Sequence, residues 1–441
     1  MIRCFKTWAT PFFKINSHPI TYHHNKMKLL LQSALSEINA AIKITGSKSE
    51  TNRLLLLKAL FPNISLANTS NSDDSEVMGA ALATNNQQPT TNNEIIDIHH
   101  AGTAMRFLTA YFAVNAGREV VLTGSSRMQE RPIKILVEAL EQLGAVITYE
   151  KEVGYPPIRI KGQKITASKV TLAANVSSQY ISALLLIASK LENGLELTLE
   201  GEITSIPYIK MTLALLNDLD IPTSFEGNLI KVAPKSTVEP KEMTVESDWS
   251  SASYYFSIAA LADAATITIS SYKENSLQGD SALVSLYRDM GVESSFNGNQ
   301  LTLTKQAHFD YQDVTFDLNN TPDIAQTIVV TCLGLGIGCH LTGLHTLKIK
   351  ETDRLEALRI ELTKLGANIT VTNESLTLVT TKEINSNITI ATYNDHRMAM
   401  AFAPLALRVP IFIENAEVVS KSYPDFWEDL KSLGFAMEDI A

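Results

Sequence analysis

A cluster of polar or small residues runs directly into a mostly apolar stretch six times along the chain. The apolar stretches carry few charges on any side, so each predicts a helix that is buried on most of its faces. The six starts are GSKSETNRLLLLKAL at Gly46, AGTAMRFLTAYFAV at Ala101, VSSQYISALLLIAS at Val176, WSSASYYFSIAALA at Trp249, TPDIAQTIVVTCLG at Thr321 and YNDHRMAMAFAPLAL at Tyr393. Such recurrence predicts a fold built from repeated units.

A second helical pattern follows most of these stretches. It is amphipathic and ends near Leu-Gly, as in LEQLGAVITYE and LTKLGANITVT, before the sequence becomes β-rich. Gly144, Gly291, Gly366 and Gly434 have the position of C′ residues, where glycine ends a helix in the left-handed conformation. The predicted unit is strand, buried helix, strand, amphipathic helix and strands, about 70 residues long. In the first unit, residues 83–94 (ATNNQQPTTNNE) predict a surface loop in place of strands.

The first turns of the buried helices carry polar residues that suit helix caps and anions. Ser47 and Glu50 match a capping box, and Thr321 with Pro322 fits the N-cap and N1 positions. If the helix starts point the same way, their free N–H groups and positive dipole ends converge on one anion-binding region.

The size and charge of the chain limit the class of protein. A length of 441 residues allows two well-buried domains, and a net charge of −10 argues against general nucleic-acid binding. No apolar run reaches the roughly 20 residues of a membrane span. The cysteines Cys4, Cys332 and Cys339 match no metal or disulfide pattern, which favours a reducing compartment. We expect a monomeric, cytoplasmic protein that binds neither nucleic acid nor membranes.

Residues 1–26 differ from the rest, because they carry Arg3, Lys6, Lys14 and Lys26 and no acidic residue. A basic, acid-free start is typical of a targeting peptide, but an apolar core and a cleavage signal are missing. The alternative is an upstream start codon, with Met27 as the true beginning. In either case we expect an N-terminal extension without fixed structure.

Basic residues gather at the predicted helix starts. One such cation alone is commonly a solvated surface charge, but their recurrence in an acidic protein predicts a ligand with several negative charges. The stretch AIKITGSKS does not indicate a P-loop, because it lacks the first glycine of that motif. The cations are Lys48, Arg53, Arg106, Arg131, Lys350, Arg354, Arg397 and Lys421.

Two acidic residues stand among these cations. Asp323 lies at the start of the TPDIAQ helix, and Glu351 lies between Lys350 and Arg354. Carboxylates in such surroundings are candidates for acid/base catalysis. The alternatives are a first-turn acid favoured by the helix dipole for Asp323 and an i,i+3 pair with Arg354 for Glu351. The residues alone leave both interpretations open.

Short motifs from about Ile38 to the end of the chain resemble those of the EPSP synthase (3-phosphoshikimate 1-carboxyvinyltransferase) family. Each motif is weak by itself, but the set occurs in the family's order and is therefore very specific. The motifs are GSKSxxNR, AGTAMR, RMxERP, VSSQ, SxPYI, SSASY, NSxQGD, PDxAxT, KETDRL, TYNDHRMAM and KSxPD. The resemblance implies an α/β fold, a two-domain inside-out α/β barrel in which each domain has three βαβαββ repeats.

The resemblance also implies how the chain divides between the domains. The N-terminal strand is expected to cross over, so that residues 27–45 and 247–441 form one domain. Residues 46–246 form the other, inserted domain, and the site lies between the two. Two basic faces that repel each other should stay open until anions arrive.

The implied reaction transfers the enolpyruvyl group of phosphoenolpyruvate (PEP) to the 5-hydroxyl of shikimate 3-phosphate and releases phosphate, in chorismate and aromatic amino acid biosynthesis. It proceeds by addition and elimination, which carboxylates and lysine can catalyse without a cofactor or metal. The family's shikimate 3-phosphate contacts correspond to Lys48, Ser49, Arg53, Ser177, Ser178, Gln179, Ser205, Tyr208, Asp323 and Lys350. Its PEP contacts correspond to Lys48, Gly102, Arg131, Gln179, Arg354, Arg397 and Lys421.

Three of these positions carry the implied chemistry. Asp323 resembles the family's proton acceptor, and Glu351 resembles the acid/base group near the PEP methylene. Lys48 is implied to contact both substrates. Arginines suit the surrounding positions, because they hold phosphates and carboxylates bidentately and so fix their orientation.

The chain departs from the family pattern near the AGTAMR motif. His100 stands where the family commonly has Asn, and Phe107 stands where it commonly has Pro. The family often has Asn near Thr346. These changes leave the implied catalytic residues intact, but they bear on the shape of the PEP pocket. We expect reduced sensitivity to glyphosate, the family's PEP-site inhibitor.

Two other functions compete with this interpretation. The sister enzyme that transfers enolpyruvyl to UDP-N-acetylglucosamine commonly uses a cysteine on a mobile loop in its first half. Here Cys332 and Cys339 fall in a stretch that predicts an apolar, glycine-rich helix. The second competitor is an inactive anion-binding regulator, against which the retained acids and cations argue.

Overall fold

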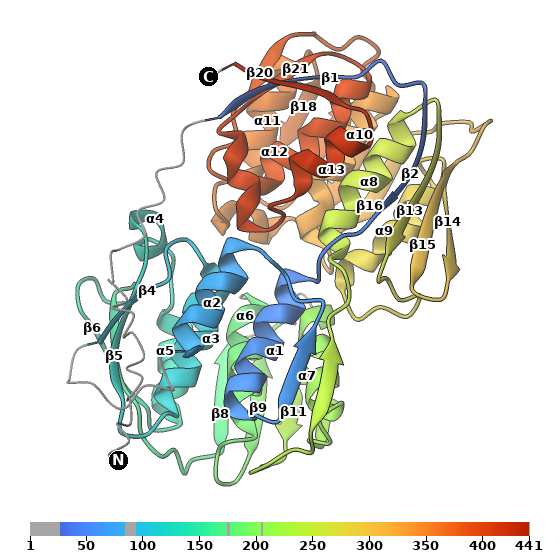
Figure 1. Cartoon of the computed structure of the whole chain (residues 1–441). Coiled ribbons are helices and arrows are strands. Elements are labelled where there is room, and N and C mark those ends of the chain that lie inside the picture. The colour runs from blue at the N-terminus through green and yellow to red at the C-terminus, as the bar shows by residue number, and fades with distance from the viewer. Residues whose placement is uncertain (1–26, 84–93, 174–176, 204–205, 441) are drawn as a thin grey trace, which may run out of the picture.

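The computed structural model describes residues 27–83, 94–173, 177–203 and 206–440. It has two lobes, one above the other in Figure 1. The lower lobe runs from α1 (Lys48–Leu60) to β11 (Leu229–Val232), and the upper lobe runs from α8 (Trp249–Leu261) to the C-terminus. The predicted extension of residues 1–26 and the candidate residue Ser205 lie outside the described residues.

Two stretches of the lower lobe follow the predicted order of strand, helix, strand, helix and two strands. In each, the first two strands are parallel and the last two form an antiparallel hairpin. The first comprises β4 (Glu94–Asp97), α3 (Gly102–Ala113), β5 (Glu119–Thr123), α5 (Lys134–Gln142), β6 (Val146–Tyr149) and β7 (Ile158–Lys161), with α4 (Ser126–Gln129) before α5. The second comprises β8 (Lys169–Ala173), α6 (Ser178–Ala188), β9 (Leu195–Glu200), α7 (Ile206–Asn217), β10 (Thr223–Glu226) and β11.

The upper lobe contains the same unit. One copy is complete within its own stretch and pairs in the order β16-β17-β19-β18. It comprises β16 (Val314–Asp317), α10 (Ala325–Leu335), β17 (Cys339–Thr342), α11 (Arg354–Lys364), β18 (Asn368–Val371) and β19 (Leu376–Val379), with the short helices η3 (Pro322–Ile324) and η4 (His345–Ile349). Cys339 therefore begins a strand, so the prediction that it lies in a helix with Cys332 is wrong.

The two lobes exchange strands at the crossovers. Strand β2 (Glu37–Ile42) leads into α1 but pairs in parallel with β13 (Ala264–Ser270) of the upper lobe. Strand β12 (Lys241–Thr244) leads into α8 but pairs in parallel with β3 (Ile64–Ala67) of the lower lobe. The chain therefore crosses between the lobes twice, and the crossing segments meet at a bridge between Gly46 and Ser247.

The remaining units of the upper lobe use strands from the N-terminal region. Strand β2 completes a sheet of order β14-β15-β13-β2, and β1 lies between β21 and β22. In the lower lobe α2 (Asp73–Ala83) follows β3, and the sheet of this first unit has two described strands. The other elements are β1 (Lys28–Gln32), η2 (Gly279–Ala282), α9 (Leu283–Arg288), β14 (Val292–Asn297), β15 (Gln300–Lys305), β20 (Ile388–Ile390), α12 (His396–Phe402), η5 (Ala403–Leu407), β21 (Ile411–Glu414), η6 (Ala416–Lys421), α13 (Phe426–Ser432) and β22 (Ala436–Asp439).

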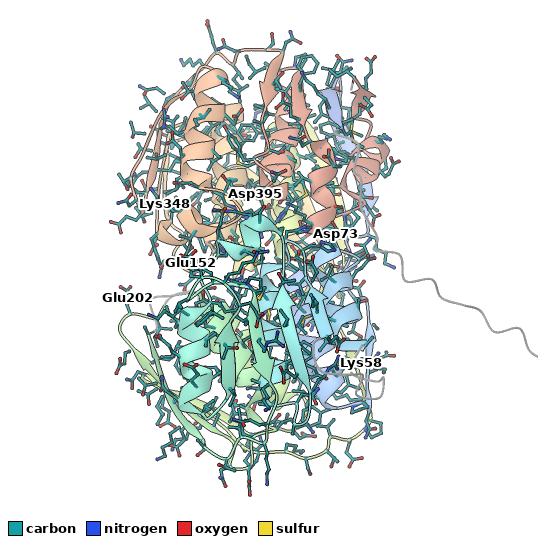
Figure 2. The ribbon with its side chains drawn as sticks, turned by 90° about the vertical axis from the view of Figure 1, so that its left-hand side faces the viewer. Lys58, Asp73, Glu152, Glu202, Lys348 and Asp395 are labelled. Carbon is teal, nitrogen blue, oxygen red and sulfur yellow. The ribbon has the colours of Figure 1, made fainter. Side chains whose placement is uncertain are left out.

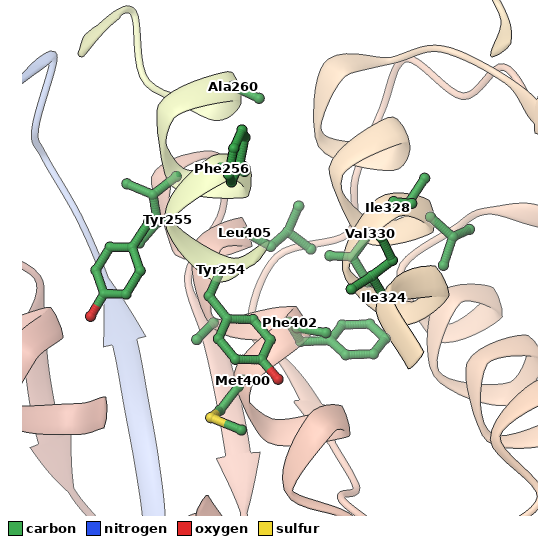
Figure 3. Close-up of a cluster of buried hydrophobic side chains, with 14 of the residues drawn as sticks. Tyr254, Tyr255, Phe256, Ala260, Ile324, Ile328, Val330, Met400, Phe402 and Leu405 are labelled. Carbon is green, nitrogen blue, oxygen red and sulfur yellow. The ribbon is translucent and has the colours of Figure 1, made fainter. Parts of the chain in front are cut away.

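Each lobe has its own hydrophobic core. One core contains residues 29–44 and 249–435, and the other contains residues 54–245. The predicted helices are buried on most faces, and α8, α10 and α12 supply the upper core with Phe256, Val330 and Phe402 (Figure 3). The separate cores support the proposed division into residues 27–45 plus 247–441 and residues 46–246. None of the helices in the described ranges has the length and hydrophobicity to cross a membrane.

Glycines end the amphipathic helices as predicted. Gly144, Gly366 and Gly434 directly follow the C-cap residues of α5, α11 and α13, and their φ angles are +100°, +94° and +98°. Side chains are strained at these angles, so glycine is favoured. Gly291 also has a positive φ of +79°, but it lies two residues beyond the C-cap Asp289 of α9.

Candidate active site

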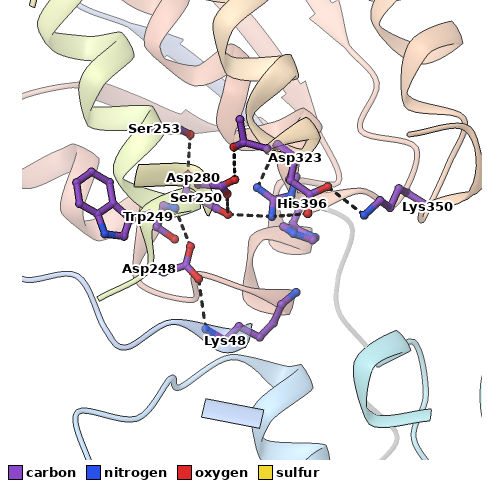
Figure 4. A network of polar contacts seen from close by, with 12 residues as sticks. Lys48, Asp248, Trp249, Ser250, Ser253, Asp280, Asp323, Lys350 and His396 are labelled. Carbon is purple, nitrogen blue, oxygen red and sulfur yellow. Dashed lines mark hydrogen bonds and ion pairs between the residues drawn. The ribbon is translucent and has the colours of Figure 1, made fainter. Parts of the chain in front are cut away.

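The helix starts of the two lobes approach one another where the lobes face each other. The backbone N–H of Lys48 donates to Oδ2 of Asp248 at 3.3 Å, which joins the start of α1 to that of α8 (Figure 4). Nε2 of Gln179 donates to Oγ1 of Thr103 at 3.2 Å, which joins the starts of α6 and α3. These contacts bring helix starts together in two pairs, α1 with α8 and α3 with α6.

Polar contacts also connect the lobes on the side of α2. The Ser420 hydroxyl donates to Oδ2 of Asp73 at 2.6 Å, and Nδ2 of Asn71 donates to Oδ2 of Asp425 at 2.8 Å. Figure 2 shows Asp73 and Asp395 at the junction between the lobes. The faces that carry the candidate residues are thus held close together.

Asp323 lies at the centre of a cation cluster in the upper lobe. Its Oδ1 is 3.2 Å from Nζ of Lys350 and 2.9 Å from Nη1 of Arg354, and its Oδ2 is 3.5 Å from Nη2 of Arg397 (Figure 4). Burial alone would raise the pKa of Asp323, but Lys350, Arg397 and Arg354 together hold that pKa well below its usual range. The carboxylate is therefore ionised and tightly paired.

Arg354 ties this cluster to two further carboxylates. Its Nε donates to Oδ2 of Asp395 at 2.6 Å, and its Nη2 donates to Oε2 of Glu351 at 2.8 Å. Burial would raise the pKa of Glu351, but Arg354, Arg131, His396 and Lys48 hold it well below its usual range. Arg131 and Lys48 belong to the lower lobe, so the charges of the two lobes act on each other across the junction.

The lower lobe presents cations with fewer partners. Nζ of Lys48 is 3.4 Å from Oδ2 of Asp74, a buried carboxylate on α2. The guanidinium of Arg131 lies on Gly102, where an added Cβ would come within 2.6 Å of Nη1. Glycine is thus required for this close approach. Nε of Arg131 is buried without a hydrogen-bond partner in the described part of the chain.

Arg53 organises the candidate shikimate 3-phosphate residues. It is buried and donates to Oγ1 of Thr212 at 2.8 Å, to the carbonyl of Ser49 at 2.7 Å and to Oγ of Ser182 at 3.0 Å. Its guanidinium lies 5.8 Å from the ring centre of Tyr208. Burial lowers the pKa of Arg53 to about 10, so an anion beside it would be strongly attracted.

The other predicted residues occupy the edges of the same region. Ser177 is the N-cap of α6, where its hydroxyl accepts from the N–H of Gln179, and Ser178 is nearly buried. Nζ of Lys421 donates to the carbonyl of Asn394 at 2.6 Å. Burial lowers the pKa of Lys421, and Lys48 of the lower lobe contributes to this direction. The charges that act on Lys421 therefore come from both lobes, with Asp74 and Lys48 on the lower side.

Two helix-start predictions are only partly right. The Ser47 hydroxyl accepts from the N–H of Glu50 as a cap, but the N–H of Ser47 donates to the carbonyl of Glu246 at 2.7 Å. The Glu50 carboxylate therefore does not close a capping box and instead accepts from the N–H of Glu246 at 3.3 Å. Thr321 holds the N-cap position before Pro322 without a side-chain cap, because its hydroxyl donates to Asp280.

The sequence did not distinguish partner carboxylates or structural cations from ligand-binding residues. Asp74 and Asp395 pair with Lys48 and Arg354, yet in the sequence they resemble ordinary helix-start acids. Arg106, predicted as a ligand cation, donates to the backbone carbonyls of Gly102 at 3.1 Å and Pro132 at 3.0 Å. Its role is therefore to fix the turn that carries Gly102. A signal for these roles exists only in three dimensions.

The described residues contain no group of three or more His, Cys, Asp or Glu side chains that could hold a metal ion. Cys332 and Cys339 are buried free thiols in the upper-lobe core, away from the cations of the lower lobe. Neither cysteine lies on a loop of the first half, as the competing UDP-N-acetylglucosamine activity would require.

Comparisons with known proteins identify the family of the chain. The family model for EPSP synthase (3-phosphoshikimate 1-carboxyvinyltransferase) matches residues 33–430. A 3-phosphoshikimate 1-carboxyvinyltransferase of Bacteroides fragilis is 45% identical over 93% of this chain and 99% of its own length. One of Shewanella woodyi is 34% identical over 92% and 100%.

The fold is also similar to that of solved structures. A solved EPSP synthase from Acinetobacter baumannii superposes with a TM-score of 0.76 at 20% identity, covering 94% of this chain and 100% of that chain. A second structure from the same organism gives a TM-score of 0.74. The chain therefore belongs to the EPSP synthase family.

Proposed function

We propose that this chain transfers the enolpyruvyl group of PEP to the 5-hydroxyl of shikimate 3-phosphate with the residues gathered between its lobes. The reaction is that of its family, and it supplies chorismate and aromatic amino acid biosynthesis. The observation that carries the assignment of residues is the Asp323 carboxylate, paired with Lys350, Arg354 and Arg397 opposite the cations of the lower lobe.

In this proposal the lower lobe binds shikimate 3-phosphate around Arg53. Lys48, Ser49, Ser177, Ser178, Gln179 and Tyr208 contact the substrate, and Ser205 is assigned by family resemblance alone. Asp323 and Lys350 reach it from the upper lobe. The buried guanidinium of Arg53, held by neutral oxygens, supports a site for an anionic group.

PEP binds between the lobes, clamped by cations of both. Arg131 above Gly102 supplies one side together with Lys48 and Gln179. Arg354, Arg397 and Lys421 supply the other side. The lobes already touch through Lys48, Asn71 and Ser420, so bound anions tighten this junction by neutralising cations that otherwise repel, with the domain boundaries near Thr45 and Ser247.

Asp323 acts as the proton acceptor once the substrates are bound. In the ligand-free state, burial raises its pKa, but three cations hold it so low that the carboxylate is a weak base. Substrate phosphate and carboxylate groups draw Lys350, Arg354 and Arg397 into new pairs, and this raises the pKa of Asp323. Proton abstraction is thereby coupled to complete substrate binding.

The chemistry is addition followed by elimination. Substrate anions also draw Arg354, Arg131 and Lys48 into new pairs, which raises the pKa of Glu351, so that Glu351 takes up a proton from solvent as the substrates bind. Asp323 then takes the proton of the 5-hydroxyl, and the oxygen forms a bond to C2 of PEP while Glu351 delivers its proton to C3. The C2–O bond to phosphate then breaks, C3 returns its proton to Glu351, and the proton on Asp323 leaves with phosphate. Lys48 neutralises the phosphate charge that develops. Much of the rate comes from holding two anions together out of water.

We also propose that the chain works as a monomer in the cytoplasm on these small anionic substrates, without nucleic acid as a partner. The buried free thiols of Cys332 and Cys339 are compatible with a reducing compartment. Size-exclusion chromatography with light scattering and cell fractionation test these two statements. A stable oligomer or a membrane-enclosed location would contradict them.

The function is tested by release of inorganic phosphate. We expect release only when PEP and shikimate 3-phosphate are both present, with stoichiometric formation of the enolpyruvyl product. UDP-N-acetylglucosamine in place of shikimate 3-phosphate should give no release, and turnover of any kind excludes an inactive anion-binding regulator. Absence of phosphate release with both substrates would overturn the proposal.

A further inference from the structure

His100 is a histidine of the site that the implied chemistry does not use. It lies on the turn before α3, two residues before Gly102, and its Nε2 is 3.7 Å from Oδ1 of Asp74. That nitrogen is buried and has no hydrogen-bond partner in the described part of the chain, although a third of the side chain (34%) is exposed. At 3.7 Å the contact with Asp74 is too long for a hydrogen bond, so this buried nitrogen stays without a partner among the described residues of the ligand-free protein.

The ring is surrounded by charges from several elements. Asp74 of α2 lies beside it, and the ring also feels the electrostatic influence of Asp73 of α2, Lys48 of α1, Lys421 of η6 and the neighbouring His99. Burial, followed by Lys421, lowers the pKa of His100 to about 4, while Asp73 acts in the opposite direction. The imidazole is therefore neutral at pH 7 in the ligand-free protein.

Two of these neighbours, Lys48 and Lys421, are the cations to which the proposed function assigns PEP. Oδ2 of Asp74 pairs with Nζ of Lys48 at 3.4 Å while Oδ1 faces His100, so one carboxylate links the lysine to the ring. An entering phosphate or carboxylate neutralises both lysines and adds negative charge beside the ring. Each change favours the protonated form of histidine.

We propose that His100 is a further PEP-binding residue, which takes up a proton from solvent when PEP enters and then lies as an imidazolium between the anion and Asp74. This inference rests on the proposed function. A protonated ring donates from both nitrogens, so it can serve Asp74 and the PEP anion at once, whereas a neutral ring donates to only one. The proton returns to solvent when phosphate leaves.

The consequence is that the affinity for PEP depends on pH through the titration of one side chain, His100. The free protein keeps His100 neutral down to a pH of about 4, and the complex holds it protonated at higher pH. Between these limits PEP binds more tightly as the pH falls, by up to about tenfold per pH unit for one proton. Above this range the effect disappears.

The test compares wild type with His100→Asn, which keeps an amide donor but does not titrate. We expect the wild-type to variant ratio of kcat/KM for PEP, at saturating shikimate 3-phosphate, to rise as the pH falls from 8.5 to 6. The matched control is His99→Asn, because His99 is half-exposed at 49% and has a φ of +49°, which Asn tolerates. Its profile should parallel that of wild type.

A second measurement removes turnover. The Asp323→Asn protein, saturated with shikimate 3-phosphate in a weakly buffered indicator solution at pH 7, should take up protons when PEP is added. The double variant with Asp323→Asn and His100→Asn should take up fewer protons. Equal uptake, or a His100→Asn profile parallel to wild type, would overturn the inference. If wild type itself releases no phosphate at any pH, the proposed function fails instead.

Discussion

The two faces of the site differ in how their charges are balanced. In the upper lobe Arg354 pairs with Asp323, Glu351 and Asp395, at 2.9, 2.8 and 2.6 Å. In the lower lobe, within the described residues, Arg53 and Arg131 have no carboxylate within ion-pair distance. The upper face is neutralised from within, whereas the lower face, where Lys48 pairs with Asp74, keeps two arginines whose natural partners are external anions.

This difference indicates a division of labour between the lobes. Internal pairs fix the geometry of the upper-lobe acids before substrates arrive, which is the preorganisation that catalysis needs. Uncompensated cations raise the potential of the lower lobe and attract anionic substrates. We therefore propose that the lower lobe contributes mainly to binding and that the upper lobe, besides its share of the PEP clamp, contributes most of the chemistry.

The largest expected effect follows from removing the upper-lobe acids. Asp323→Asn and Glu351→Gln should each lower kcat by roughly 10² to 10⁴, the usual cost of losing acid/base catalysis. The helix-start position of Asp323 alone would cost about 1 kcal/mol of stability on truncation. Its three cation partners make truncation costlier, so the amide, which keeps the shape, is the better variant.

Surface variants provide the control for these two substitutions. Asp310→Asn and Glu374→Gln change exposed acids that take no part in the cation clusters and should keep wild-type turnover. Steady-state phosphate release distinguishes the outcomes. Near-wild-type kcat in folded Asp323→Asn or Glu351→Gln would remove that residue from the mechanism and weaken the division between the lobes.

The second prediction concerns stability on the two faces. Arg354→Gln should lower the free energy of unfolding by about 3–5 kcal/mol, because it leaves buried carboxylates without a partner. Arg131→Gln should change it by no more than about 0.5 kcal/mol. Instead, Arg131→Gln should raise KM for PEP roughly ten- to hundredfold, the value of one hydrogen-bonded charge.

Chemical denaturation and steady-state kinetics measure these two quantities side by side. Arg127→Gln is the matched control for Arg131, because Arg127 lies on α4 nearby, is half-exposed and pairs with Glu130. It should change neither stability nor KM. Equal stability losses for Arg354→Gln and Arg131→Gln would refute the contrast between the faces.

The third prediction concerns the crossover between the faces, where Glu50 and Glu246 are buried together. Burial, with a contribution from Glu246, raises the pKa of Glu50 from 4.5 to about 7. The unfolded chain loses this proton at lower pH, so stability falls as the pH rises from about 4.5 to 7. At about 1.4 kcal/mol per pKa unit, the loss is at most on the order of 3 kcal/mol.

Glu50→Gln removes this titration while keeping the shape and a hydrogen-bonding oxygen. Its Tm should exceed that of wild type by more at pH 8 than at pH 5. Glu76→Gln changes an exposed residue on α2, so its Tm should differ from that of wild type by the same amount at both pH values. A gain for Glu50→Gln that is equal at both pH values would contradict a raised pKa.

Most of the fold could be predicted because its signals are local. A polar turn followed by an apolar stretch, and an amphipathic helix closed by Gly144, Gly366 or Gly434, can be read within one unit. The gathering of cations at helix starts likewise followed from spacing and dipoles. Each of these local patterns predicts the element that the folded chain contains.

What the sequence did not indicate depends on contacts between distant segments. The Glu50 carboxylate turns to the N–H of Glu246, 196 residues away, because the N–H of Ser47 is already bonded to the Glu246 carbonyl. Arg106 looked like a ligand cation until backbone carbonyls were found to occupy it. Local patterns indicate which groups are charged but not which partner each one meets.

The smallest expected effect concerns Phe107, where the family commonly has proline. The ring is fully buried and lies 5.4 Å from the guanidinium of Arg53, so it serves packing on the shikimate 3-phosphate side of the lower lobe. The same helix carries Gly102 and Thr103 at its start, beside Arg131 and Gln179. A small shift of this turn should penalise glyphosate more than PEP if glyphosate fills the pocket more tightly.

Phe107→Pro should therefore increase sensitivity to glyphosate by roughly fivefold, which corresponds to about 1 kcal/mol. Phe107→Leu is the control, because it removes the ring but keeps the backbone N–H and the helix. Leucine should leave glyphosate inhibition unchanged and raise KM for shikimate 3-phosphate a fewfold, since a cation–π contact is worth about 0.5–1 kcal/mol. Proline in the sixth position of α3 also removes a helix hydrogen bond, so the folded fraction must be measured first. Equal, tight inhibition of wild type and folded Phe107→Pro would show that this position does not control the PEP pocket, and the contrast between the faces would then rest on charge alone.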